Sequence, residues 1–124
     1  MASPKYQANA NSIEIKTANE IETLITATGT YGTVIQQVVI QANQDVTSGM
    51  IKFYIMIDIA SETWQLIREV PVSEVISTNQ YPAFSNIISF NDIVLPIEKK
   101  LGVSTVNSES FSITVFGLDV LDYV

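Results

Sequence analysis

The chain has 124 residues, a net charge of −7 and no cysteine or histidine, with 47% hydrophobic and 15% charged residues. This length suits one domain with a single core, and the apolar content is too high for a disordered chain. The acidic balance argues against binding to duplex nucleic acid or an anionic membrane, and no apolar run reaches the length of a membrane-spanning helix.

The first segment, residues 1–11, is polar and rich in Asn, Ala and Ser. It lacks the apolar stretch of a signal peptide and cannot bury enough apolar surface to order itself. We therefore predict a flexible N-terminal arm over residues 1–11 and one domain over residues 12–124. Two interpretations of the arm stay open. It is either a frayed terminus or a segment that orders on a neighbouring molecule, with Tyr6 as its anchor.

Alternating apolar and polar residues then predict short strands at residues 13–16, 21–27 and 34–42. In the third of these, one face is predicted to hold Val34, Val38, Ile40 and Ala42, with Gln37 and Gln41 on the other. Residues 28–32 read as a turn, because Gly29 and Gly32 can both adopt a positive φ.

The strongest pattern lies in residues 48–72, around which the other strands are expected to be arranged. From residue 50 to 60 the side chains alternate between two faces. The core face is predicted to hold Ile51, Phe53, Ile55 and Ile57. Tyr54 and Met56 make the opposite face more apolar than free solvent favours. That face is covered either by neighbouring parts of the same chain or by another subunit, and both interpretations stay open.

A polar break at residues 60–63 predicts a hairpin turn, and residues 64–69 return as a strand. Neither face of this return strand is uniformly apolar, which a β-bulge would explain. Pro71 cannot donate to a sheet ladder, so the strand ends there or lies on an edge.

After an irregular piece at residues 73–86, short strands are predicted at 87–90, 93–95, 101–106 and 111–115, with turns at 91–92 and 107–110. About eight short strands without a helical period predict an all-β fold, an antiparallel β-sandwich of jelly-roll type. The predicted core combines the central strand with two others: Ile51, Phe53, Ile55, Ile57, Val38, Ile40, Phe111, Ile113 and Val115.

Most familiar catalytic chemistry is excluded by composition. Without histidine and cysteine, the nucleophilic triads and the usual zinc sites cannot be built. Carboxylate pairs for glycosidase chemistry are conceivable, but solvated surface charges explain them better. The pairs are Asp119 with Asp122 and Glu62 with Glu69. Calcium needs converging oxygens, and Asp45, Asp58 and Asp92 are separate in sequence. We expect no enzyme activity, no metal and no cofactor.

Two further patterns carry weak functional signals. The Gly-Thr-Tyr-Gly stretch at residues 29–32 lacks the lysine of a phosphate-binding loop. Trp64, Tyr81 and Phe84 could form a platform on which a sugar stacks, although packing in the core and loops explains these aromatic residues better.

Two stretches resemble small virion proteins of tailed bacteriophages. The first runs from Gly49-Met-Ile-Lys-Phe-Tyr-Ile to Leu66-Ile-Arg-Glu-Val-Pro-Val72. The second comprises Val94-Leu-Pro96, Leu101-Gly-Val-Ser-Thr105 and Glu109-Ser-Phe-Ser-Ile-Thr-Val-Phe-Gly-Leu-Asp119. The resemblance covers roughly residues 32–124, and its motifs are packing and turn signals. Residues 97–100, Ile-Glu-Lys-Lys, depart from it where a glycine is expected.

The resemblance implies a structural protein of the virion, an auxiliary or decoration protein of the capsid. Its expected partners are the major capsid protein or other virion proteins and further copies of itself, with a trimer as one possibility. A carbohydrate- or receptor-binding module of a tail or head fibre is the alternative. From the residues themselves we predict Tyr6, Tyr54 and Met56 as protein-interaction residues.

Overall fold

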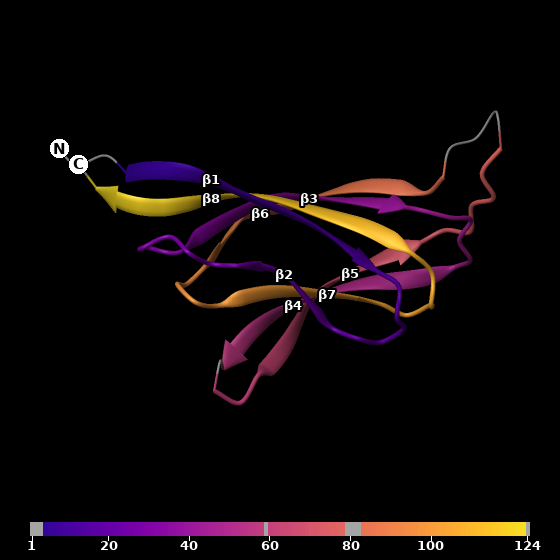
Figure 1. The fold of residues 1–124 in the computed structure, drawn as a ribbon, viewed down its shortest axis with the longest axis horizontal. Helices are drawn as coiled ribbons and strands as arrows, with labels where there is room; N and C mark the ends of the chain where they lie inside the picture. The colour runs from indigo at the N-terminus through magenta and orange to yellow at the C-terminus, as the bar shows by residue number, and fades with distance from the viewer. Residues whose placement is uncertain (1–3, 59, 79–82, 124) are drawn as a thin grey trace.

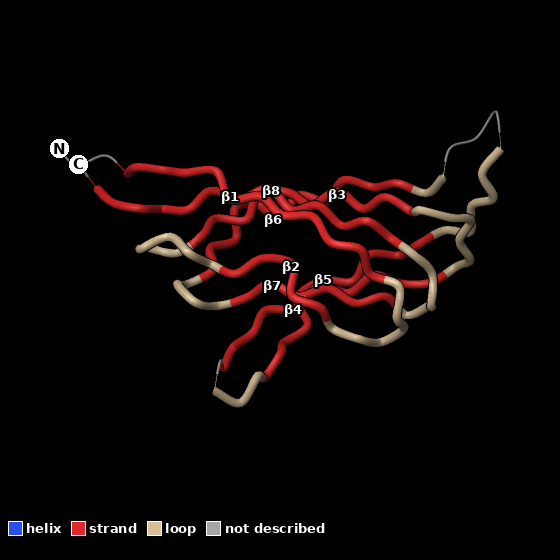
Figure 2. The backbone as a smooth tube through the Cα atoms, in the orientation of Figure 1, coloured by secondary structure: helices blue, strands red, loops and turns tan. Residues whose placement is uncertain are grey.

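A computed structural model describes residues 4–58, 60–78 and 83–123. These residues form β-strands and connections, and none forms a helix that could span a bilayer. Figures 1 and 2 show two layers of strands, which run as follows: β1 (Pro4–Ile15), β2 (Glu22–Thr26), β3 (Thr33–Ala42), β4 (Gly49–Asp58), β5 (Thr63–Val72), β6 (Ser85–Leu95), β7 (Lys100–Thr105) and β8 (Phe111–Tyr123).

The two layers are four-stranded antiparallel sheets. The first sheet has the order β1-β8-β3-β6 and the second has the order β2-β7-β4-β5. β1 pairs with β8, β2 with β7, β3 with β6 and β4 with β5. The chain is therefore one long hairpin whose turn lies between β4 and β5. It is wrapped so that β3 also meets β8 and β4 also meets β7. This is the jelly-roll arrangement, so the predicted fold is confirmed, as is the hairpin at its centre.

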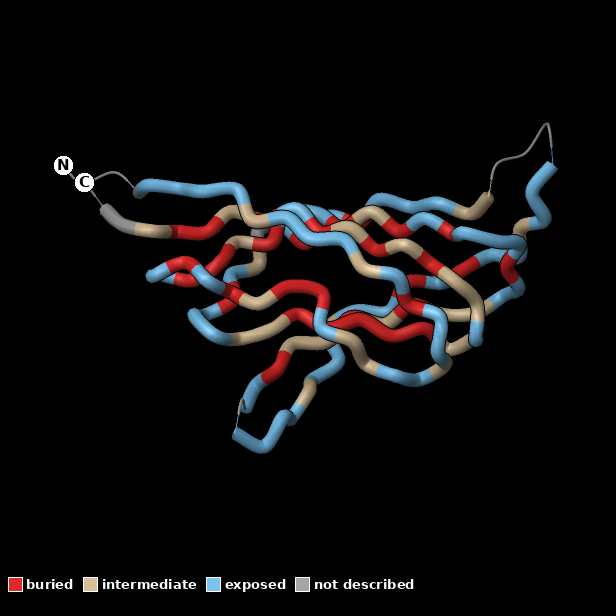
Figure 3. The backbone as a smooth tube through the Cα atoms, in the orientation of Figure 1, coloured by how far each residue is buried: buried red, intermediate tan, exposed pale blue. Residues whose placement is uncertain are grey.

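The core lies between the two sheets. Buried and exposed positions alternate along the strands (Figure 3), because successive side chains point to opposite faces. The rings of Phe53 from β4 and Phe90 from β6 meet edge to face, with their centroids 5.2 Å apart. Seven of the predicted core residues are buried: Ile51, Phe53, Val38, Ile40, Phe111, Ile113 and Val115.

The predicted core face is wrong near the tip of the β4–β5 hairpin. Ile57 is 50% exposed and Ile55 is only partly buried against the core. The strand register shifts twice along this hairpin, between Phe53 and Tyr54 and again between Met56 and Asp58. The first shift skips Ile67 of β5 and is the predicted bulge. The second skips Ile57, and Figure 1 shows that this tip projects from the body of the sandwich.

Residues 4–11 are not a flexible arm. They form most of β1, whose register with β8 runs from Pro4 opposite Tyr123 to Ile15 opposite Phe111. Figure 1 shows the indigo and yellow strands side by side, with the two termini at the same end of the molecule. Backbone pairing can order a polar segment, because alternate residues of an edge strand gain ladder hydrogen bonds without needing apolar side chains. Residues 1–3 lie outside the described part.

Two predicted breaks are also absent. The turn predicted at residues 91–92 is an irregularity inside the continuous strand β6, where Asn91 has a φ of 51°. β8 does not stop at residue 115 but continues to Tyr123. Gly32, in contrast, has the positive φ expected of its turn, 95°, and a Cβ there would lie 2.4 Å from the Leu95 carbonyl oxygen.

Candidate protein-interaction surface

The structure does not bring the three predicted interaction residues together. Tyr6 lies on β1 of the first sheet and is 54% exposed. Tyr54 and Met56 lie on β4 of the second sheet. Tyr6 is thus available to a partner, on a different sheet from the other two.

The outer face of the second sheet is covered largely by its own chain. Met56 is only 4% exposed although it stands outside the main core cluster, and it pairs with Trp64 of β5. The Trp64 ring and Ile21 occupy the space over Gly102, because a Cβ there would lie 2.7 Å and 2.8 Å from them. Tyr54 is half-buried, and its hydroxyl lies 3.1 Å from that of Ser104. Within one chain Met56 is already buried, which favours coverage by the same chain at this residue, whereas Leu66 opposite Tyr54 is 42% exposed.

The outer face of the first sheet is different, because it is apolar and carries no charge over three complete cross-strand rows. Each row takes one residue from β1, β8, β3 and β6 in turn. We call these twelve residues the neutral face: Ala8, Leu118, Val34 and Val94; Ala10, Phe116, Gln37 and Ser89; Ser12, Thr114, Val39 and Ile87. Eight of the twelve are apolar and none can ionise.

The large side chains of the neutral face reach solvent. Ile87 is 64% exposed, Val94 55% and Phe116 40%. A hollow of about 420 Å³ opens beside them, lined by Tyr6, Val34, Gln36, Val94 and Leu118. Depletion of charge and enrichment in apolar and aromatic side chains mark the centre of protein interfaces. The neutral face with its hollow is therefore the best candidate contact surface among the described residues.

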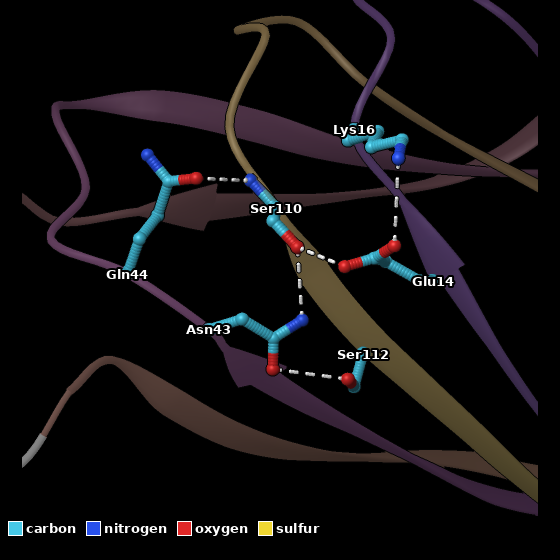
Figure 4. Close-up of polar contacts among 6 residues, drawn as sticks. All are labelled: Glu14, Lys16, Asn43, Gln44, Ser110 and Ser112. Carbon is cyan, nitrogen blue, oxygen red and sulfur yellow. Dashed lines mark hydrogen bonds and ion pairs between the residues drawn. The ribbon is translucent and has the colours of Figure 1, made fainter.

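A polar network closes one end of this face, where the β7–β8 turn meets β1 and the β3–β4 connection (Figure 4). The Ser110 hydroxyl donates to Glu14 at 2.6 Å and accepts from the Asn43 amide at 3.0 Å. Ser112 donates to Asn43 at 3.0 Å. Lys16 lies 3.9 Å from the other Glu14 oxygen. The cross-strand row that follows the neutral face, which contains Glu14 and Ser112, therefore carries the first charged side chain at this end.

Asp119 was expected to be a solvated charge, but it is only 7% exposed on the inner side of β8. Its carboxylate accepts hydrogen bonds from Thr33 at 2.6 Å, Thr28 at 2.7 Å and Asn9 at 2.9 Å. Burial by itself raises the pKa of this carboxyl, but these hydrogen bonds and one from the Gly29 backbone outweigh it and hold the pKa below its usual value. This arrangement ties β1, β3 and the β2–β3 turn to β8.

The other acidic candidates serve local structure or face solvent. Glu62 and Glu69 are both exposed, at the tip and along the edge strand of the hairpin. Asp58 accepts from the backbone N–H of Ala60 at 3.0 Å, and Asp45 accepts from that of Ser77 at 2.9 Å. No three potential metal ligands converge among the described residues. The side chains of Asp92 and Asp122 lie outside the described part.

The three aromatic residues of the suggested sugar platform do not gather in the described part of the chain. Trp64 lies over Gly102 on the outer face of the second sheet. Phe84 packs against the core, and Tyr81 lies outside the described residues.

The sequence did carry a signal for the neutral face. Val39 on β3 and Phe116 and Leu118 on β8 are apolar at positions between those of the core. Val34 was instead predicted on the face of Val38 and Ile40, and the register shift between Ile35 and Gln37 turns it outward. A strand that is apolar on both sides indicates a second covered face. Phe116 and Leu118 lie beyond residues 111–115, the part of β8 whose alternation was used to predict the strand, so they were not assigned to a face.

No protein-family model and no curated protein matches the sequence. Among solved structures, the fold is similar to that of a chain in the "Crystal structure of the T13 IBDV viral particle", with a TM-score of 0.52 and 13% sequence identity. The match covers 94% of this chain and 31% of that one, so this chain spans about a third of its neighbour's length. At this identity the likeness shows a shared fold and nothing finer.

Proposed function

We propose that this protein is a non-enzymatic structural component of a virus particle, an auxiliary or decoration protein on the capsid of a tailed bacteriophage. The observation that carries the proposal is the jelly roll, matched along 94% of the chain by part of a protein from a viral particle. The assignment to tailed phages and to the capsid rests on the sequence resemblance from Gly49 to Asp119.

Jelly rolls also form lectins and cupin enzymes, so the fold alone does not choose the function. The surface supports protein contact over the other two uses. The neutral face offers exposed apolar side chains on a rigid sheet. The Trp64 ring packs over Gly102, which disfavours a role in stacking against a sugar. The sequence has no histidine or cysteine to serve an enzyme.

The proposed partners are the major capsid protein or other virion proteins. A capsid presents the same binding site many times, so several weak contacts can give stable attachment. The net charge of −7 makes DNA and anionic lipid unsuitable partners. The proposed location is therefore the assembled particle rather than the genome inside it or a membrane.

Binding of the full chain to capsids that lack it tests this function. We expect saturable co-sedimentation with the capsids and no retention on a glycan array. Failure to bind capsids, together with specific retention on the array, would instead support the carbohydrate-binding module of a tail or head fibre.

A further inference from the structure

The neutral face has no covering element in the described part of the chain. It lies on the side of the first sheet away from the second sheet, which covers only the inner side. Monomeric proteins seldom expose a large contiguous apolar patch without a function for it. We therefore expect another molecule to cover the neutral face.

We infer that the occupant is a second copy of this chain, packed face to face through the first sheet. Charge is the first reason. Each copy carries a net charge of −7, so two copies repel each other through most surfaces. The three rows of the neutral face bring no charged side chain to the contact. A basic partner would gain little from these three rows, because none of their twelve residues offers a carboxylate to pair with.

Shape is the second reason, because the face is complementary to itself. One end carries the hollow bordered by Val34, Val94 and Leu118. The other end carries Ile87, the most exposed of its large side chains. A two-fold axis that lies between the two sheets, parallel to the middle row, exchanges the Val94 row of one copy with the Ile87 row of the other. It places the Ile87 row of each copy over the hollow of the other, which is the reciprocal contact that an isologous dimer requires.

The size of the neutral face sets the strength of the contact. Four strands about 4.8 Å apart and three rows about 6.6 Å apart give a face of roughly 400 Å². Two such faces bury roughly 800 Å² in all, which is less than the roughly 1,200 Å² of stable specific interfaces. We therefore expect a weak, reversible dimer that forms as the concentration rises. This inference goes beyond the proposed virion role and does not depend on it, because it concerns the free protein.

Light scattering during gel filtration of the full chain, over a range of concentrations, tests the dimer. The mass should rise from 13.7 kDa to twice that value as the concentration increases. Ile87→Glu places like charges in the contact and should raise the dissociation constant about tenfold or more. Ile76→Glu is the matched control, because Ile76 lies outside the sheets and is 63% exposed against 64% for Ile87. It should dimerise like the unmodified chain.

A cross-link tests the two-fold axis. The chain has no cysteine, so Gln37→Cys introduces a single thiol. Because residue 37 lies on the middle row, the two-fold axis places it opposite residue 37 of the second copy. Mild oxidation should give a disulfide-linked dimer, whereas Ser61→Cys at the hairpin tip should stay largely monomeric. A mass of 13.7 kDa at every concentration, a trimer, or equal dimerisation of Ile87→Glu and the control would overturn the inference. None of these results would affect the capsid-binding test, which can fail on its own.

Discussion

Asp119 shows how one side chain can join distant parts of the chain. Its partners Asn9, Thr28 and Thr33 come from β1, the β2–β3 turn and β3. Such a carboxylate is stable only because each of its oxygens has donors, since an unpaired buried charge is costly. Sequence could not reveal this, because Asn9 and Asp119 are 110 positions apart and neither residue type signals burial.

We predict that Asp119→Asn lowers the free energy of unfolding by about 1.5–3 kcal/mol at pH 7, the usual range for hydrogen bonds to a charged group. The lowered pKa of Asp119 means that the carboxylate stabilises the fold above the pKa of the unfolded chain. That contribution is lost as the pH falls through the folded-state pKa. Urea unfolding at pH 7 and in acid should therefore show the difference between the two proteins shrinking below about pH 4. Glu74→Gln, at an exposed position, is the control, and an undiminished difference in acid would contradict the prediction.

Phe53 and Ile57 test the corrected core face, because both were predicted to be buried on the same strand. Phe53 is fully buried and Ile57 is 50% exposed. Phe53→Ala should therefore cost about 3–5 kcal/mol of unfolding free energy, and Ile57→Ala less than about 1 kcal/mol. Equal losses in urea unfolding would mean that the second register shift of the hairpin is wrongly placed.

At the scale of the element, strands could be predicted from the sequence where apolar and polar side chains alternate. They could not be predicted where only backbone pairing with a distant strand orders the segment. β4 follows from its isoleucines, which favour a half-buried pleated surface. The polar part of β1 gave no such signal, because it is ordered by pairing with β8, from the opposite end of the chain. The irregularity at Asn91 resembled a turn because asparagine favours a positive φ in either setting.

The pairing of β1 leads to a prediction for the chain without residues 1–11. The deletion removes most of the β1–β8 ladder and the hydrogen bonds that Asn9 and Asn11 give to Asp119 and Leu24. The two side-chain bonds alone are worth about 2 kcal/mol, so with the ladder also lost the melting temperature should fall by more than about 6–12 °C. A flexible arm would leave it unchanged.

The double variant Asn9→Ala and Asn11→Ala keeps the ladder and should lose less stability than the deletion. Circular dichroism melting compares the three proteins. If the truncated chain melts within about 1 °C of the full chain, the outer part of β1 contributes nothing to the fold.

At the scale of the molecule, the fold class followed from strand count and spacing, whereas the contact surface did not. Tyr54 and Met56 were chosen because their face looked too apolar for solvent, and the structure places Trp64 and Ile21 over part of that face. The neutral face needs the register of four strands from all parts of the chain before its rows can be recognised. Long-range pairing is the information that a single sequence lacks.

The central claim is that this jelly roll is a repeated component of a virus particle. Quantitative mass spectrometry of purified virions, counting this chain against the major capsid protein, tests it most directly. A decoration protein should be present in a fixed ratio to the capsid subunits and of the same order of abundance. Absence from the particle would contradict the virion role altogether, and a few copies per particle would contradict the capsid location and indicate a tail or head fibre.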